Sequence, residues 1–388
     1  MVLVRGNDPY TGIEISQQAA WKTPMTTSFR TVPFIGETMT FERETLAVPK
    51  EMGTTGFREF VEYGRSFVKG TVTILGRYDA QWWNIMLAHA FYGETVVADS
   101  WVDGTVLNGG GGAAPPGNTH IYSFGSVLPM GLTIRVHKGG QSIGKYDEFA
   151  GCMVSQFSIE QPENDVAKFT FTFTGYTMAT NVQSGGLAAI GGVAPIRIRD
   201  HGNNPSTAWA GYCKVGATPT AINFRSFRIN VDRHVDFDAA FLNNLDNIDQ
   251  PGITEVRDVT CEFTAFVEQS YGDAFKPATE FLAKTASKAD ILMVADATDT
   301  TKRLYNSGAA AYRPYALRLE FPKVYWTRVP NSIQSGGAND ATYAFTATKG
   351  SFDQTGSLPD GLTGDFRALV SVKDTDEPTP DAKFSNQP

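Results

Sequence analysis

The stretch Lys168-Phe-Thr-Phe-Thr-Phe-Thr174 decides the fold class of this chain, because it alternates aromatic and polar side chains at every step. In an extended strand, successive side chains point to opposite faces of the sheet. The three phenylalanines therefore share one face, while the lysine and the threonines, including Thr170 and Thr172, share the other. This pattern is typical of an antiparallel sheet with a core on one side and water on the other.

Residues 224–238 show the same split in the second half of the chain. We expect one strand whose apolar side carries a single charge, Arg233, and whose polar side ends in an acidic stripe made by Asp232, His234, Asp236 and Asp238. Carboxylates and imidazole are ordinary metal ligands. Neighbours on one face of a flat strand stand about 7 Å apart, too far to converge on one ion. A solvated acidic face is therefore favoured over a metal site.

The order of expected elements occurs twice. Residues 36–75 predict a hairpin that leads into a helix at 80–92, where Trp82, Met86, Leu87 and Ala90 recur at the helical period, with Asp79 as N-cap and Gly93 as stop. Residues 224–267 and a helix within 272–284 repeat that order. The repeat predicts a mainly β chain with two tandem β-sandwich or barrel domains, each flanked by one helix.

The predicted division follows composition. The stretch between the halves is rich in glycine, proline and small residues, as linkers are. A length of 388 residues suits two domains. The expected segments are an N-terminal arm at 1–20, a first domain at 21–180, a linker at 181–220, a second domain at 221–374 and a C-terminal tail at 375–388.

Composition narrows the class of protein. The chain has 38 Gly, 20 Pro and 19% charged residues, which is typical of turn-rich β proteins. A net charge of -8 argues against a surface that grips nucleic acid, although nucleic acid can still pass nearby. Cys152, Cys213 and Cys261 lack the spacing of a disulfide framework or zinc site and are expected to be buried. No signal peptide or membrane span is predicted, so we expect assembly in a cytoplasm.

No set of residues predicts catalysis. Gly140-Gln-Ser-Ile-Gly144 fits the nucleophile-elbow pattern, but that motif needs a following helix, and residues 149–159 predict a strand. The five histidines are scattered, and no phosphate-binding loop is present. The sequence therefore predicts a building block that is not an enzyme and needs neither a cofactor nor a metal.

The first half, residues 30–180, resembles the phage tail tube proteins of long, non-contractile tails. The resemblance rests on the 37–75 hairpin, the 80–92 helix and the run Gly151-Cys-Met-Val-Ser-Gln-Phe-Ser-Ile159, followed by a Phe/Thr strand that ends in Gly175. The second half is similar in element order alone, and the stretch between the halves is not matched.

This resemblance implies a virion structural protein that is assembled in the host cytoplasm. Subunits of such tubes form rings whose sheets join edge to edge into one barrel, and the rings stack into a hollow channel for DNA delivery. Ring closure removes exposed strand edges. Most such subunits carry one domain and form hexamers, so a chain with two implies a pseudo-hexameric trimer. Its partners are then other copies of itself, other tail proteins at the tube ends, and double-stranded DNA that passes without specific binding.

The resemblance also suggests two sets of functional residues. A channel lined with Thr, Asp and Glu lets a duplex pass without counterion release, whereas a Lys/Arg lining binds phosphates. The lumen-facing candidates are Glu42, Glu44, Thr170, Thr172, Asp232, Asp236 and Asp238. The alternative is that these strands face outward. Ring-stacking contacts are expected in the hairpin connections and the terminal arms, with the candidates Pro49, Lys50, Glu51, Met52, Asn244 and Asp246.

Other functions stay open at this point. A tail terminator or distal tail protein shares the expected fold. A non-viral β-sandwich ligand-binding module fits the aromatic content, yet it predicts an export signal and an exposed aromatic platform. A hydrolase on a β scaffold requires convergent acid and base residues, and the sequence offers only widely spaced candidates.

Overall fold

The computed structural model describes most of the sheet-forming parts of the chain. The described residues are 11–18, 21, 23–32, 34–46, 62–76, 80–98, 100–102, 117–125, 131–138, 145–163, 165–183, 196–197, 212–216, 220–222, 224–236, 252–253, 256–266, 276–295, 303–304, 313–330, 340–352 and 363–372. Within them the protein is mainly β with two helices, which confirms the predicted fold class.

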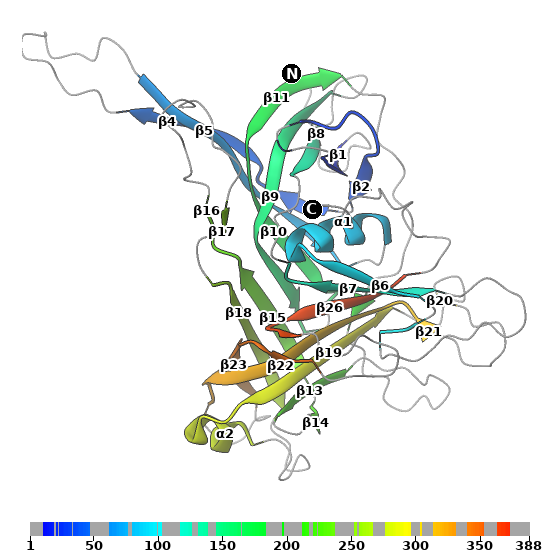
Figure 1. The fold of residues 1–388 in the computed structure, drawn as a ribbon, viewed down its shortest axis with the longest axis vertical. Coiled ribbons are helices and arrows are strands. Elements are labelled where there is room, and N and C mark those ends of the chain that lie inside the picture. The colour runs from blue at the N-terminus through cyan, green and yellow to red at the C-terminus, as the bar shows by residue number, and fades with distance from the viewer. Residues whose placement is uncertain are drawn as a thin grey trace, which may run out of the picture.

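The first half of the chain lies above the second in Figure 1, with the hairpin of β4 and β5 projecting from it. Its elements are β1 (Thr11–Gln17), β2 (Arg30–Val32), β3 (Phe34–Glu37), β4 (Thr40–Leu46), β5 (Glu62–Leu75), α1 (Ala80–Phe91), β6 (Glu94–Val97), β7 (Asn118–Ser123), β8 (Leu132–Lys138), β9 (Lys145–Gln161), β10 (Lys168–Gly175) and β11 (Thr177–Gln183).

The second half lies below the first, and α2 is at its lower end (Figure 1). Its elements are β12 (Ile196–Arg197), β13 (Tyr212–Gly216), β14 (Thr220–Ala221), β15 (Phe224–Asp232), β16 (Val235–Asp236), β17 (Gly252–Ile253), β18 (Asp258–Phe266), α2 (Pro277–Ala283), β19 (Ser287–Ala295), β20 (Arg303–Leu304), β21 (Arg313–Pro314), β22 (Ala316–Arg328), β23 (Asp340–Ala347), β24 (Gly350–Ser351), β25 (Thr363–Gly364) and β26 (Arg367–Val372).

Two four-strand segments of sheet have the same strand order. Antiparallel pairing places β4, β5, β10 and β9 side by side in the first half. It places β15, β18, β23 and β22 side by side in the second half. In sequence, each segment consists of a hairpin, a helix and a later pair of strands. The tandem-domain organisation itself stays a prediction, because one 20-stranded sheet contains strands of both halves.

The register irregularities of the two segments also match. The register of β3 opposite β5 shifts between Phe34 and Gly36, and the register of β15 opposite β18 shifts between Phe224 and Ser226. A shift immediately precedes Gln156 of β9 opposite β10, and another immediately precedes Arg328 of β22 opposite β23. A β-bulge is a specific local feature, so a shared bulge fixes the alignment of the halves. Positions matched in this way are called equivalent below; they include Phe34 with Phe224, Phe41 with Val231, Glu42 with Asp232, Arg43 with Arg233, Gln156 with Arg328, and Phe157 with Val329.

Strand β10 confirms the alternation on which the fold prediction rests. Phe169, Phe171 and Phe173 are buried, while the lysine and threonines between them are half-buried. Strand β15 confirms the apolar side predicted for residues 227–231. The expectation of one strand over 224–238 is wrong, because β15 ends at Asp232 and His234 has a left-handed φ of 47°. Val235 and Asp236 then pair with β17 in a separate small sheet.

The helix predicted at 80–92 is confirmed as α1, and Met86, Leu87 and Ala90 are buried as expected. The residue that ends α1 is not Gly93 as predicted: Tyr92 takes the left-handed conformation with φ 63°. Gly93 instead permits close chain contact, since a Cβ there would lie 2.7 Å from the Ser123 carbonyl oxygen. The predicted N-cap Asp79 and the side chain of Trp82 lie outside the described residues.

The second predicted helix is confirmed as the shorter α2, which has Pro277 in its first turn and is followed by Lys284, a left-handed C-cap residue with φ 53°. Proline suits the first turn because the amide hydrogen it lacks has no partner there. Both helices thus end in the same conformation.

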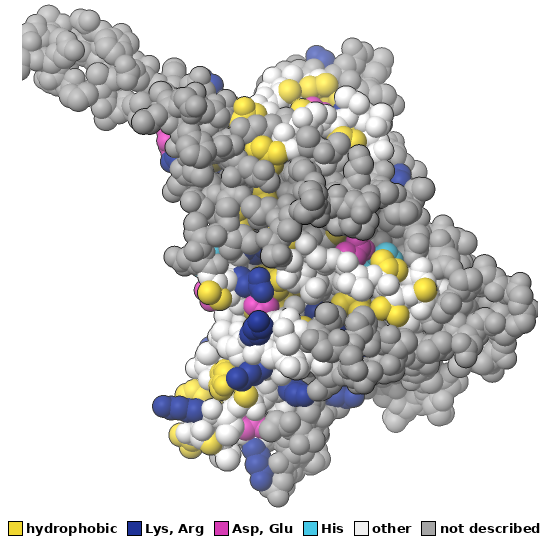
Figure 2. All heavy atoms as spheres, viewed as in Figure 1, with side chains coloured by type: hydrophobic (Ala, Val, Ile, Leu, Met, Phe, Trp, Pro, Cys, Tyr) yellow, Lys and Arg dark blue, Asp and Glu magenta, His cyan; other side chains and the backbone are white. Residues whose placement is uncertain are grey.

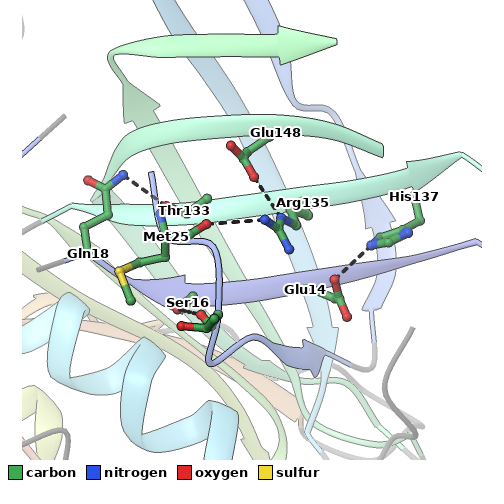
Figure 3. A network of polar contacts seen from close by, with 9 residues as sticks. Glu14, Ser16, Gln18, Met25, Thr133, Arg135, His137 and Glu148 are labelled. Carbon is green, nitrogen blue, oxygen red and sulfur yellow. Dashed lines mark hydrogen bonds and ion pairs between the residues drawn. The ribbon is translucent and has the colours of Figure 1, made fainter. Parts of the chain in front are cut away.

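A polar network links β1, β8 and β9 in the first half (Figure 3). His137 Nε2 lies 3.0 Å from Glu14 Oε2, and both side chains are buried. Arg135 Nε donates to Glu148 Oε2 at 2.8 Å, and Gln18 Nε2 donates to Thr133 Oγ1 at 3.1 Å. Buried polar groups need such partners, so this network fixes how β1 lies on β8.

Strand β1 lies inside the segment predicted to be an arm, and it buries Ile13 and Ile15. Strands β12 and β13, within the predicted linker, pair with β19. The described parts of both segments are therefore built into the sheet. Local periodicity did not predict these short strands, because partner strands distant in the sequence stabilise them. The predicted tail at 375–388 lies outside the described residues.

The halves share one core and are joined along two seams. Strand β9 pairs with β15, and β7 pairs with β26. Phe91 of α1 contacts Phe157 of the first half and Phe366 of the second, with both pairs of ring centroids 5.3 Å apart. The three cysteines are free and buried, as predicted. Burial raises the pKa of the Cys152 thiol well above its usual range.

Candidate assembly surface

The pairing of β9 with β15 is the central feature of the candidate surface, because it joins the two equivalent segments into one sheet. Its register runs antiparallel from Phe227 opposite Gln161 to Asp232 opposite Gln156. The strand order across both segments is therefore β4, β5, β10, β9, β15, β18, β23 and β22. We call the pairing of β9 with β15 the internal junction.

Polar and apolar contacts alternate along the internal junction. Gln156 Nε2 donates to Asp232 Oδ2 at 2.6 Å on the solvated face. On the opposite face, Val231 and Phe157 lie opposite each other and are both buried. Burial of such apolar contacts stabilises the junction by about 25 cal/mol per Å² of apolar surface removed from water.

Arg233 crosses the internal junction into the first half. It is only 2% exposed, its Nη1 donates to the carbonyl oxygen of His89 at 3.1 Å, and its guanidinium lies 3.0 Å from the centroid of the Tyr92 ring. The Arg233 backbone N–H also donates to Ser155 O at 3.1 Å. The single charge that sequence analysis placed on the apolar side is thus a buried side chain that locks α1 to β15.

Burial shifts the pKa values of all three groups around this contact. Desolvation, with the Arg233 charge as a smaller cause, lowers the pKa of His89 to about 3. Desolvation raises the pKa of Tyr92 to about 12, and lowers that of Arg233 to about 10. The histidine is therefore neutral and the arginine charged at neutral pH.

The two outer edges of this eight-strand order are β4 and the end of β22. Among the described strands, β4 pairs with β5 alone. On the side of β22 away from β23, pairing with β19 stops at Val324, four residues before the strand ends at Arg328. Phe41 on β4 is 36% exposed, although its equivalent Val231 is buried. The edge positions thus carry groups that the internal junction covers.

A polar face runs across all eight strands. The strand registers place these residues on it: Thr40, Glu42, Lys69, Thr71, Thr73, Lys168, Thr170, Thr172, Gln156, Ser158, Glu160, Arg228, Asn230, Asp232, Asp258, Thr260, Glu262, Thr264, Thr342, Thr346, Tyr325 and Arg328. Cross-strand threonine pairs recur at equivalent positions, with hydroxyl oxygens 3.1 Å apart for Thr73 and Thr170 and 3.2 Å apart for Thr264 and Thr342.

The structure places four of the predicted lumen residues on this polar face: Glu42, Thr170, Thr172 and Asp232. Glu44 lies further along β4, where Arg65 Nη2 contacts its Oε1 at 2.8 Å. The side chain of Asp236, all of Asp238, and the stacking candidates Pro49, Lys50, Glu51, Met52, Asn244 and Asp246 lie outside the described residues. The assignments to lumen and stacking stay predictions.

The polar face carries positive as well as negative side chains, whereas the predicted lining was acidic. Lys168 Nζ lies 2.8 Å from Asp165 Oδ2, and Arg328 Nη1 lies 3.4 Å from Glu262 Oε1. Figure 2 shows lysine and arginine side chains spread over the lower part of the molecule on the side in view. Sequence analysis missed these cations because it followed single strands, whereas the face is assembled across strands.

The acidic stripe does not form a metal cluster in the described residues. His234 Nε2 lies 3.1 Å from Asp258 Oδ2, and the His234 backbone N–H donates to Asp232 Oδ1 at 3.0 Å. No helix in the described part of the chain is long and apolar enough to cross a membrane.

Phe41, Gln156 and Arg328 were not predicted as site residues, because no sequence motif marks a strand edge. One signal was present: Glu42-Arg43 and Asp232-Arg233 are the same acid–arginine pair at equivalent positions.

These features define a class of protein, a β-sheet subunit whose polar face continues through an internal junction to two edge strands. The chain belongs to the phage tail tube protein family, whose model matches residues 96–348, more than half of the chain. The match begins within β6 and ends just after β23, so it covers the internal junction and most of the second half but not β4, β5 or α1. No curated protein matches the chain. The chain is therefore a structural protein of a phage tail tube.

Proposed function

We propose that this protein is the major tail tube subunit, which polymerises into stacked rings around a channel for DNA delivery. The observation that carries this proposal is the internal junction, which already joins two equivalent four-strand segments edge to edge. If the same kind of pairing joins the outer edges of successive copies, the sheet closes and no edge strand is left exposed. Because each chain supplies two segments, three copies give a ring with six similar lobes.

The polar face suits the inner wall of that channel. Threonine hydroxyls are uncharged, and cations of the face lie beside carboxylates, such as Lys168 beside Asp165 and Arg328 beside Glu262. A DNA duplex binds a protein tightly when free Lys and Arg release its counterions. A wall of threonines and paired charges gives little such binding, so the duplex slides past. Glu42, Thr170, Thr172 and Asp232 are then lumen residues.

Stacking of rings completes the tube in this proposal. The connections after β4 and before β17 contain the stacking candidates, and the projecting β4–β5 hairpin points away from the rest of the sheet (Figure 1). Other tail proteins bind the open ends of the stack, and assembly takes place in the host cytoplasm. A tail terminator or distal tail protein is the alternative within the virion, and it differs by not forming long tubes alone.

Electron microscopy of the purified protein at rising concentration tests this function. A major tube subunit forms rings or stacked hollow cylinders without a partner. Isolated rings that never stack indicate a terminator or distal tail protein, and dispersed monomers at every concentration contradict the proposal.

A further inference from the structure

We propose that successive copies of this chain meet by pairing β4 of one copy with the end of β22 of the next, in the register of the internal junction. Glu42 of one copy then faces Arg328 of the other. This inference rests on the proposed function and deepens it, because it specifies which edges meet and which residues lie opposite each other.

The register follows from the equivalent positions. At the internal junction Gln156 of β9 lies opposite Asp232 of β15. The position equivalent to Gln156 is Arg328, and the position equivalent to Asp232 is Glu42. Repeating the internal junction between two copies therefore places Arg328 opposite Glu42.

The charges fit this register. The internal pair is an amide that donates to a carboxylate, and the proposed pair is a guanidinium facing a carboxylate, which makes a stronger charge-assisted contact. The Arg328 side chain is 63% exposed, so it can turn from Glu262 toward a second copy.

The apolar side chains fit as well. At the internal junction, a large residue on β9, Phe157, faces a small one on β15, Val231. At the proposed contact the sizes are exchanged, since Val329 follows β22 and Phe41 lies on β4. The summed volume is the same in both places, and interfaces are tightly packed where volumes match. This pairing also explains why Phe41 is exposed in the single chain.

The backbone also permits this pairing. The backbone N–H of Arg233 donates to Ser155 O. Hydrogen-bonded and non-bonded positions alternate along an antiparallel pair. On β9, Ser155 and Phe157 therefore make the backbone hydrogen bonds across the junction, and Ser158 makes none. The equivalent positions on the β22 side are Thr327 and Val329, while Pro330, which has no N–H, falls at a position that makes no such bond. In this pairing the Arg43 side chain reaches into the next copy, as the Arg233 side chain reaches into the first half.

Cysteine cross-linking tests the register. Residues directly opposite in such a pair have Cα atoms about 4.5 Å apart, within the range of a disulfide. The double variant Glu42→Cys with Arg328→Cys is expected to give covalent dimers and trimers on oxidation, seen on non-reducing gels and lost on reduction. Gln156→Cys with Asp232→Cys is the matched internal reference, and it links within one chain. Thr40→Cys with Arg328→Cys is two residues out of register and is expected to link poorly.

The outcomes separate this inference from the proposed function. If the unmodified protein forms rings but the out-of-register pair links better than Glu42→Cys with Arg328→Cys, the register is wrong and the ring proposal stands. If the unmodified protein forms no rings and neither pair links, both proposals fail.

Charge exchange provides a second test. Glu42→Arg and Arg328→Glu are each expected to raise the concentration needed for ring formation by about tenfold, and the two together to restore it. Lys349→Glu, at an exposed lysine outside β4 and β22, serves as the control. Normal assembly of both single variants, or no recovery in the double variant, overturns the pairing of Glu42 with Arg328.

Discussion

The two halves of this protein build the same sheet segment but cover it differently. In the first half, α1 buries Met86, Leu87 and Phe91. In the second half the shorter α2 leaves Phe281 and Leu282 exposed, and Figure 2 shows apolar side chains at that end of the molecule. Strand order and bulges recur although the covering elements do not. The constraint that both halves share is therefore on the edges and register of the sheet.

A second comparison sets the internal junction beside the outer edges. Arg233 is buried against α1, whereas its equivalent Arg43 is exposed. Val231 is buried, whereas its equivalent Phe41 is exposed. If the halves are true equivalents, changes at the internal junction will impair folding, and changes at the edges will impair assembly alone.

The largest expected effect is at Phe157, which is 2% exposed at the internal junction. Phe157→Ala leaves a cavity beside Val231 and Phe91, so we expect the free energy of unfolding to fall by about 3–5 kcal/mol. The matched change Val329→Ala, at a half-buried edge position, is expected to cost under about 1 kcal/mol in the unassembled subunit. Urea denaturation measures both, and equal losses would contradict the distinction between a buried junction and a free edge.

The next effect is at Arg233. Arg233→Met removes a donor from the carbonyl oxygens of His89 and Val154, and we expect a loss of about 2–3 kcal/mol in stability. Arg43→Met is the control; it is expected to change subunit stability by less than about 0.5 kcal/mol and to weaken ring formation. Thermal unfolding and ring yield are measured for both variants. A folding defect in Arg43→Met that equals that of Arg233→Met would contradict the distinction between junction and edge.

The pH dependence of stability should report on His89. Its pKa in the folded protein is about 3, below the ordinary 6.5, because the ring is buried and Arg233 is nearby. The unfolded chain therefore binds a proton first as the pH falls. This contribution is complete above about pH 6.5 and is lost toward pH 3, so about 2 kcal/mol is lost between pH 7 and pH 5.

Chemical denaturation at pH 7 and pH 5 tests this expectation in two variants. His89→Gln should lose this part of the pH dependence, and His234→Gln, at a half-buried position outside the core, should keep it. If His89→Gln keeps the full slope, another group is responsible.

The smallest effect on stability, though informative for function, is expected at Thr172 on the polar face. Thr172→Cys should leave stability within about 0.5 kcal/mol. A bulky maleimide reagent should label this cysteine in dispersed subunits and fail to reach it in closed tubes. Thr180→Cys, at an exposed position of β11 away from the eight strands, is the comparison. Equal labelling of Thr172→Cys in subunits and tubes would place the polar face outside.

The sequence was sufficient where a local period encodes the structure. The alternation in β10 and the helical spacing of Met86, Leu87 and Ala90 predicted the elements and their buried sides. It was insufficient where a distant strand decides the outcome. Ile13 and Ile15 are buried because β8 lies beside them, and β15 ends early because His234 adopts a left-handed conformation. The edge strands could not be predicted for the same reason, because a strand is an edge only where no other strand pairs with one of its sides.

The central claim is that one chain supplies two equivalent segments of a closed sheet. Native mass spectrometry of isolated rings tests it most directly, because it counts the copies in each ring. We expect three copies, with each internal junction taking the place of one contact between subunits. Rings of six copies would contradict it, because they would show that the two halves do not alternate around one channel.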